Sequence, residues 1–232
     1  AHTIPVPEEW PSKGEVIFSD AHLRYRPGLP YALEQFDLHI QPGERVGIVG
    51  RTGAGKSTII MALFRMVELA QGKIIMDGID ISTIGLNDLR SRMSIIPQDP
   101  TLFASTIRSN LDPFNTRTDE QLWAAIRQAH LVEDNTETAS TNKETSADNT
   151  DHKSSSNTTQ PSQITLDSIV EEGGTNFSLG QRQLLALARA LVRNSKITIC
   201  DEATSSIDFE TDLKIQKAMS EGFKGRTLLC IA

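Results

Sequence analysis

The nonapeptide Gly50-Arg51-Thr52-Gly53-Ala54-Gly55-Lys56-Ser57-Thr58 has the spacing G-x-x-x-x-G-K-[ST]. It follows the apolar run 46–49, which we interpret as a buried parallel strand, and it leads into residues that favour a helix. In this spacing successive backbone N–H groups point into one concavity, and the helix adds the positive end of its dipole. The sequence therefore predicts a phosphate-binding loop rather than a glycine-rich turn with an exposed lysine.

The residue types in this loop indicate separate roles in binding a nucleotide. Lys56 can reach the β- and γ-phosphates, and the Ser57 hydroxyl can bind Mg²⁺. Gly53 and Gly55 let the backbone close on the phosphates because they carry no Cβ atom. The order of the glycines differs from G-x-G-x-x-G, which disfavours a hydride-transferring dinucleotide enzyme. The predicted nucleotide-binding residues of the loop are Gly50, Thr52, Gly53, Ala54, Gly55, Lys56, Ser57 and Thr58.

Length and composition favour a single nucleotide-binding domain. A chain of 232 residues, 38% of them hydrophobic, can bury a substantial core. The net charge of −7 disfavours a protein that binds nucleic acid through a broad basic surface. No segment reaches the apolar length of a membrane span, so other segments would have to hold the protein at a membrane. Cys200 and Cys230 lie in apolar, strand-like runs and are expected to be buried thiols of a reducing compartment.

The first half of the chain shows short strand patterns separated by turn residues. Residues 1–13 are rich in proline and are predicted to be a linker, whereas 14–232 are predicted to form one domain. Asp77-Gly78 lies between the predicted strands 73–76 and 79–81 and tolerates the positive φ angles of a tight hairpin turn. Further strands are predicted at 16–18, 21–25, 36–40 and 94–96.

A helical pattern and a polar segment follow. Residues 118–131 are predicted to be a helix, with Thr118 as its N-cap and Gln121 three residues later. Residues 134–163 have almost no apolar side chains, so they cannot bury enough surface to offset the entropy of ordering. We predict a disordered insertion there. Its many serines and threonines leave a phosphorylated regulatory segment open, although a passive surface loop is favoured.

Two acids end a second apolar run, Ile197-Thr198-Ile199-Cys200-Asp201-Glu202. A strand of this kind delivers its final side chains to the carboxyl edge of a parallel sheet. Asp201 would hold Mg²⁺ there, and Glu202 would orient and polarise the attacking water, because phosphoryl transfer needs mainly positioning and charge stabilisation. The alternative, a solvated acidic turn, loses weight because the chain also contains the phosphate loop.

The segment Asn176-Phe177-Ser178-Leu179-Gly180-Gln181-Arg182-Gln183 precedes a run with apolar residues at helical spacing. Ser178 and Gln181 match a capping box, so we expect the helix to begin there. A helix N-terminus with a hydroxyl and a glycine is a second anion site. Within a monomer one nucleotide could not obviously use both sites.

These elements, in this order, resemble the nucleotide-binding domain of an ATP-binding-cassette (ABC) transporter. The phosphate loop resembles the Walker A motif, 197–201 the Walker B motif, Glu202 the catalytic glutamate and 205–208 the D-loop. Gln98 matches the Q-loop glutamine, and Tyr25 matches the aromatic residue that stacks on adenine; an ordinary sheet tyrosine is the alternative for Tyr25. Residues 177–181 correspond to the signature Leu-Ser-Gly-Gly-Gln, with Leu179 in place of the first glycine.

The resemblance implies a fold, cofactors and partners. The fold is α/β, a P-loop NTPase with a mixed core sheet, an antiparallel β subdomain and an α-helical signature subdomain. ATP and Mg²⁺ are the implied cofactors. Glu202, Lys56 and Gln98 would be catalytic, and Ser57, Gln98 and Asp201 would be the metal ligands. Tyr25, Ser178, Gly180 and Gln181 would also contact nucleotide, the last three on a partner domain.

Residues 10–16, 24–29 and 102–114 resemble the second nucleotide-binding domain of C-subfamily exporters, and the multidrug and oligomycin-resistance types come closest. The implied activity is ATP hydrolysis that powers export, at the cytoplasmic face of a membrane. The implied partners are a second nucleotide-binding domain and transmembrane domains that contact 98–114.

The family places a switch histidine after residues 227–232, where this sequence stops. We therefore expect a C-terminally truncated domain that binds Mg-ATP and hydrolyses it slowly or not at all. A soluble ABC ATPase of DNA repair or translation is disfavoured, because the coiled-coil insertions or basic surfaces expected of one are missing. A nucleotide-binding regulatory module without turnover is the other alternative, against which Glu202 argues.

Overall fold

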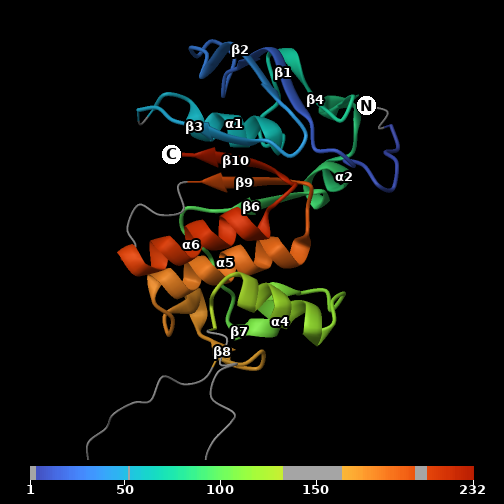
Figure 1. The fold of residues 1–232 in the computed structure, drawn as a ribbon. Coiled ribbons are helices and arrows are strands. Elements are labelled where there is room, and N and C mark those ends of the chain that lie inside the picture. Colours follow the sequence, from blue (N-terminus) through green and yellow to red (C-terminus); the bar gives the residue numbers. More distant parts are fainter. Residues whose placement is uncertain (1–3, 52, 133–163, 202–207) are drawn as a thin grey trace, which may run out of the picture.

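The computed structural model describes residues 4–51, 53–132, 164–201 and 208–232. The polar segment 134–163, predicted to be disordered, lies outside these residues. In Figure 1 a small antiparallel sheet lies above helix α1 (Lys56–Leu63), the core sheet lies below α1, and helices α5 (Leu179–Arg193) and α6 (Phe209–Gly222) cover the other face of the core sheet. The described residues are thus stacked in alternating layers of sheet and helix.

The core sheet is parallel. Its order is β3 (Arg45–Ile48), β10 (Thr227–Ile231), β9 (Ile197–Asp201) and β6 (Met93–Ile96), and every neighbouring pair runs in the same direction. The antiparallel pairs belong to the two other sheets. The predicted α/β fold class is therefore confirmed. The expectation of a mixed core sheet is corrected, because the described strands of the core sheet are all parallel and the antiparallel strands form separate sheets.

Strand β3 is half-buried, which corrects the expectation of a buried strand over 46–49. Val46 and Ile48 are partly covered, whereas Arg45 and Gly47 are exposed and Val49 beyond the strand is 80% exposed. The reason is position, because β3 is the edge strand of the described sheet and only one of its faces packs against α1.

The N-terminal sheet has the order β2 (Leu33–Ile40), β1 (Val16–Leu23), β4 (Gln71–Met76) and β5 (Ile79–Asp80). Strands β4 and β5 form the predicted hairpin, and its turn residues Asp77 and Gly78 have φ angles of 45° and 80°. Strand β1 is continuous across the two strands predicted at 16–18 and 21–25. Asp20 adopts a φ of 46° inside it, and the register shifts around this residue. The turn-like sequence thus makes a bulge rather than a break.

Helix α1 is apolar on most of its surface because it lies between two sheets. Five of its eight residues are buried, and the four apolar ones pack with side chains of both sheets into one hydrophobic core. A second core fills the space between the other face of the core sheet, α5, α6 and the helical subdomain. A helix with apolar residues around its circumference is expected at such a position.

The helical subdomain contains α3 (Ile107–Leu111), α4 (Asp119–Gln128) and a two-stranded sheet of β7 (Ser105–Thr106) and β8 (Ile169–Val170). Helix α4 begins after Thr118, and Thr118 and Gln121 form the predicted capping box. The remaining elements are α2 (Leu86–Ser91) and the short 3₁₀ helices η1 (Ile81–Thr83) and η2 (Glu172–Gly174).

The segment before β1, expected to be a linker, contributes to the core. Trp10 is 4% exposed, and its indole N–H donates to the carbonyl oxygen of Met76 at 2.9 Å. The carboxylate of Asp77 accepts the backbone N–H groups of Lys13, Gly14 and Glu15 at 2.7–3.1 Å. The hairpin turn therefore anchors the start of the domain.

We expect Asp77→Ala to lower the free energy of unfolding by about 1–3 kcal/mol, because it leaves three N–H groups, two of them partly buried, without their acceptor. Urea unfolding followed by tryptophan fluorescence measures this. Asp77→Asn is the matched control, since asparagine keeps an acceptor oxygen and tolerates positive φ. A loss of stability as large in the asparagine variant as in the alanine variant would contradict this explanation.

Candidate functional site

The phosphate loop joins β3 to α1 and uses glycine where the backbone is left-handed. Gly53 and Gly55 have φ angles of 82° and 88°, and Gly55 is the N-cap residue of α1. A Cβ atom on Gly55 would lie 2.5 Å from the carbonyl oxygen of Ala32. The loop is closed by hydrogen bonds from the N–H of Ala54 to Arg51 and from the N–H of Thr58 to Gly55. Glycine at 55 is therefore required by both conformation and space.

The charge at this loop favours an anion. The first turn of α1 has no acidic residue, so nothing there offsets the positive end of the helix dipole. The ammonium group of Lys56 folds back and donates to the carbonyl oxygen of Gly50. Ser57, the next residue, is exposed and offers a hydroxyl oxygen. The loop thus combines backbone donors, a cation and a hard oxygen ligand, as a metal-bound phosphate requires.

The parallel sheet brings Asp201 and Gln98 to the same edge as the loop. Ile48, Ile231 and Asp201 lie in one row of the register across β3, β10 and β9. Ile96 at the end of β6 pairs with Cys200, so Gln98 follows just beyond that row. Strands are about 4.8 Å apart, which puts β3 and β9 roughly 10 Å from one another across β10. Ligands bind at this edge in open α/β sheets.

Tyr25 lies beside the start of α1. Its hydroxyl is 2.9 Å from the Oγ1 atom of Thr58, the last residue of the loop, and 49% of the residue is exposed. The contact joins the segment after β1 to the phosphate loop. An exposed aromatic ring in this place can stack on a planar base.

Ser178 and Gln181 form the predicted capping box at the start of α5. The Ser178 hydroxyl accepts the N–H of Gln181 at 3.1 Å, and the Gln181 side chain accepts the N–H of Ser178 at 2.9 Å. The Ser178 hydroxyl keeps its hydrogen for an anion. Gly180 is buried where α5 meets α6, and a Cβ atom there would lie 2.6 Å from the Cγ2 atom of Thr211. Helices α1 and α5 lie on opposite faces of the core sheet (Figure 1).

The sequence did not reveal one contact between α5 and the segment that follows β6. The Gln183 amide on α5 donates to the backbone carbonyl oxygen of Gln98 at 2.6 Å, and Gln183 is only 3% exposed. Gln183 occupies an otherwise apolar helix face that also carries Leu187 and Leu191. A polar residue on an apolar helix face could have indicated a buried hydrogen bond. The sequence could not identify the partner, because Gln98 is 85 residues away.

An arginine on α5 fixes the segment after the predicted Q-loop. The Arg189 guanidinium donates to the carbonyl oxygens of Asn110 and Thr101 and to the Asn110 side chain. Asn110 in turn holds both backbone groups of Phe103 at 2.9 Å. Burial lowers the pKa of Arg189. An open cavity of about 400 Å³ lies beside this network, with the exposed rings of Phe103 and Phe114 in its lining.

Some predicted functional residues cannot be placed. Thr52, Glu202 and residues 205–207 lie outside the described residues, so their roles stay predictions. Within the described ranges, no group of three His, Cys, Asp or Glu side chains could hold a metal ion. None of the helices in those ranges has the length and apolar character needed to cross a membrane.

The layered fold, the phosphate loop and the acid at the end of β9 define a P-loop nucleotide-binding domain. The chain belongs to the ABC transporter family, whose family model matches residues 33–205. Domains of this family bind ATP, generally with Mg²⁺.

Curated relatives agree with this assignment. The chain is 58% identical over 228 residues to the ABC-type transporter cicA of Emericella nidulans, covering 98% of the chain and 16% of cicA. It is 54% identical over 229 residues to the oligomycin resistance ATP-dependent permease YOR1 of Saccharomyces cerevisiae, covering 97% and 15%. It is 47% identical over 226 residues to ATP-binding cassette sub-family C member 3 of Mus musculus, covering 97% and 13%. The predicted likeness to C-subfamily transporters is confirmed, and the chain spans about a sixth or less of the length of these relatives.

Proposed function

We propose that this chain is an ATP-binding and ATP-hydrolysing domain that powers export across a membrane as part of a larger transporter. The observation that carries the proposal is the phosphate loop at the edge of the parallel sheet where β9 ends in Asp201. Family membership supports it, because members of this family are named as transporters and permeases. The domain would act at the cytoplasmic face of the membrane.

The described residues fit Mg-ATP. The loop N–H groups, the α1 dipole and Lys56 would hold the phosphates, and the Tyr25 ring would stack on adenine. Ser57, Gln98 and Asp201 would hold Mg²⁺ through oxygen atoms, which this ion prefers; it also keeps phosphate and water ligands. When bound, Mg²⁺ would neutralise phosphate charge. Glu202 would orient the attacking water.

Two kinds of partner would complete the transporter: a second nucleotide-binding domain and the transmembrane domains. Helices α1 and α5 lie on opposite faces of the core sheet, which supports a site built from the phosphate loop of one domain and Ser178, Gly180 and Gln181 of a second domain. The cavity beside Phe103 and Phe114 would receive the transmembrane domains, because Arg189 holds that segment firmly on α5. Residues 10–16, 24–29 and 102–114 support assignment as the second nucleotide-binding domain of a C-subfamily exporter.

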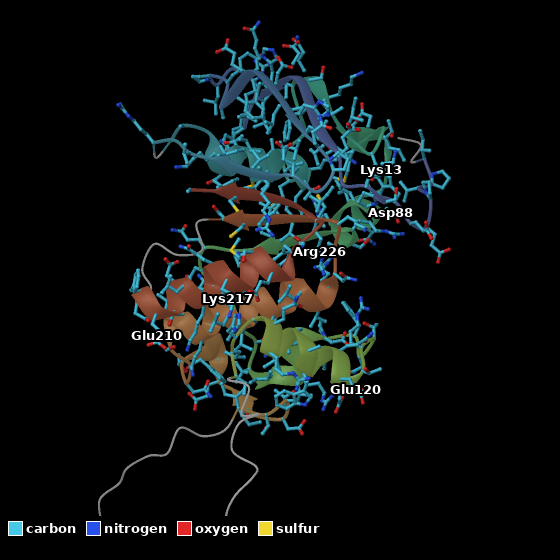
Figure 2. The ribbon with its side chains drawn as sticks, in the orientation of Figure 1. Lys13, Asp88, Glu120, Glu210, Lys217 and Arg226 are labelled. Carbon is cyan, nitrogen blue, oxygen red and sulfur yellow. The ribbon has the colours of Figure 1, made fainter. Side chains whose placement is uncertain are left out.

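Lys56→Ala tests the proposal. Removing a charged donor from a phosphate costs about 1.5–3 kcal/mol, so we expect Mg-ATP affinity to fall roughly 10- to 100-fold. Titration calorimetry on the 232-residue chain measures the affinity. Lys217→Ala is the control, because Lys217 is an exposed lysine on α6, on the far side of the core sheet from α1 (Figure 2).

Equal affinities in the Lys56 and Lys217 variants would argue against the proposed phosphate site, provided both unfold at the temperature of the wild type. Phosphate release in the same samples tests hydrolysis. Release by the wild type above the Lys56→Ala level supports turnover, whereas equal release would limit the chain to ATP binding.

A further inference from the structure

The two cysteines of the chain face each other across the centre of the core sheet. Cys200 on β9 and Cys230 on β10 are register partners in a parallel pair, and neither forms a disulfide in this structure. Partners in a parallel pair point to the same face of the sheet, and the strands are about 4.8 Å apart. This spacing lies within the range of about 4.4–6.8 Å between Cα atoms that a disulfide requires. The proposed ATPase chemistry uses neither thiol.

The two thiols differ in exposure. Cys200 is 4% exposed and belongs to the core beneath the sheet, whereas Cys230 is half-buried. Cys230 lines an open cavity of about 300 Å³ between β3, β10 and α6. Its register partner on β3 is Gly47, and a Cβ atom there would meet nothing within 4 Å. A small oxidant can therefore reach Cys230 through the space that Gly47 leaves.

The surroundings also make Cys230 the more reactive sulfur. A hydrogen bond with the Cys200 side chain lowers the pKa of Cys230 to about 7, burial opposes this shift, and the nearby Arg45 guanidinium adds to the lowering. Arg45 is held there by a hydrogen bond of 2.6 Å from its guanidinium to the carbonyl oxygen of Ser220. Thiolates are the nucleophilic form of cysteine, so this arrangement favours attack by Cys230.

We propose that Cys200 and Cys230 are a redox-modification site at which a hydroperoxide forms a disulfide between β9 and β10. The Cys230 sulfur attacks the O–O bond of hydrogen peroxide, so an S–O bond forms and hydroxide leaves to become water with the thiol proton. The Cys200 sulfur then displaces the hydroxyl group from Cys230, which leaves as a second water with the Cys200 proton. Two thiols are oxidised and one peroxide is reduced to two waters.

The proposed disulfide would lie close to the proposed nucleotide site. It joins the two central strands one register row before Asp201 and Ile231, at the sheet edge where the phosphate loop also begins. A thiol reductant reverses the reaction by attacking the disulfide. The site is therefore reversible and lies next to the proposed metal ligand.

Peptide mass mapping of the wild-type chain tests the proposal. Cleavage after lysine and arginine releases 197–214 and 227–232, each with one cysteine. After treatment with one equivalent of hydrogen peroxide, we expect a chain lighter by two hydrogen atoms and these two peptides joined by a reducible bond. Iodoacetamide labelling under denaturing conditions should fall from both thiols to none, and dithiothreitol should restore it.

Single-cysteine variants separate the two steps. In Cys200→Ala we expect dimedone to trap a sulfenic acid on Cys230, and in Cys230→Ala we expect Cys200 to stay a thiol because it is buried. Two results would overturn the proposal: oxidation of Cys230 while Cys200 of the wild type remains fully alkylatable, or a disulfide found only between chains on a non-reducing gel. The wild-type measurement does not depend on how the variants fold.

Discussion

Gly55→Ala is expected to reduce Mg-ATP affinity more than roughly 100-fold, because it displaces the whole phosphate loop rather than one donor. Gly55 has a φ of 88°, and an added Cβ atom would lie 2.5 Å from the carbonyl oxygen of Ala32. Ala32 cannot move aside easily, since its N–H donates to Leu23 at the end of β1 at 2.8 Å. The start of α1 must shift instead, and the loop N–H groups with it.

Gly53→Ala is the matched control for this variant. Gly53 has nearly the same φ, 82°, but an added Cβ atom would meet nothing within 4 Å. It adds left-handed strain of about 1–2 kcal/mol without the clash. Calorimetric titration with Mg-ATP, together with thermal unfolding, distinguishes the two. Equal losses of affinity would assign the effect to backbone strain alone, and full binding by Gly55→Ala would remove this loop from the phosphate site.

The sequence allowed prediction of the features that depend on neighbouring residues. The two capping boxes at Thr118 and Ser178 and the hairpin turn at Asp77-Gly78 are present as predicted. Each is specified by a side chain and a backbone group within three residues, or by a φ angle that few residues adopt. The positive φ angles of Gly53 and Gly55 in the phosphate loop are likewise specified by the residue type at each position.

Features that depend on distant contacts could not be predicted. The indole of Trp10 bonds to a residue 66 positions away, and Gln183 bonds to one 85 positions away. The exposure of β3 follows from its place at the sheet edge, which its own apolar residues do not specify. The bulge at Asp20 replaced a predicted break because pairing with β2 and β4 on both sides holds the strand together.

The roles in catalysis rest on chemistry that the described residues support only in part. Asp201 and Gln98 reach the edge of the sheet that carries the phosphate loop because parallel strands align their carboxyl ends. The proposed water-positioning role of Glu202 was inferred from its place after that strand and remains a prediction. The shared position of Asp201, Gln98 and the phosphate loop at one edge of the core sheet therefore supports metal binding more strongly than it supports hydrolysis.

Gly72→Ala is expected to give the largest loss of stability, about 3–5 kcal/mol, because the bulge of β1 leaves no room for a side chain at this position. On β4, Lys73 pairs with Ser19 and Gln71 pairs with His22, so Gly72 alone faces Asp20 and Ala21. An added Cβ atom would overlap the carbonyl group of Asp20 and lie 2.5 Å from the carbonyl oxygen of Ser19. These are backbone atoms of a central strand, so they cannot rotate away.

Gly78→Ala separates this clash from backbone strain. Gly78 has a φ of 80°, against 79° for Gly72, but its Cβ position is open, so we expect a cost of only about 1–2 kcal/mol. Urea unfolding followed by the fluorescence of Trp10 and Trp123 reports both hydrophobic cores, since one tryptophan packs in each. A similar loss in the two variants would mean that β1 and β4 separate readily at the bulge. A much greater loss for Gly72 would show that the bulge is a rigid part of the sheet that covers α1, and hence of the support beneath the phosphate loop.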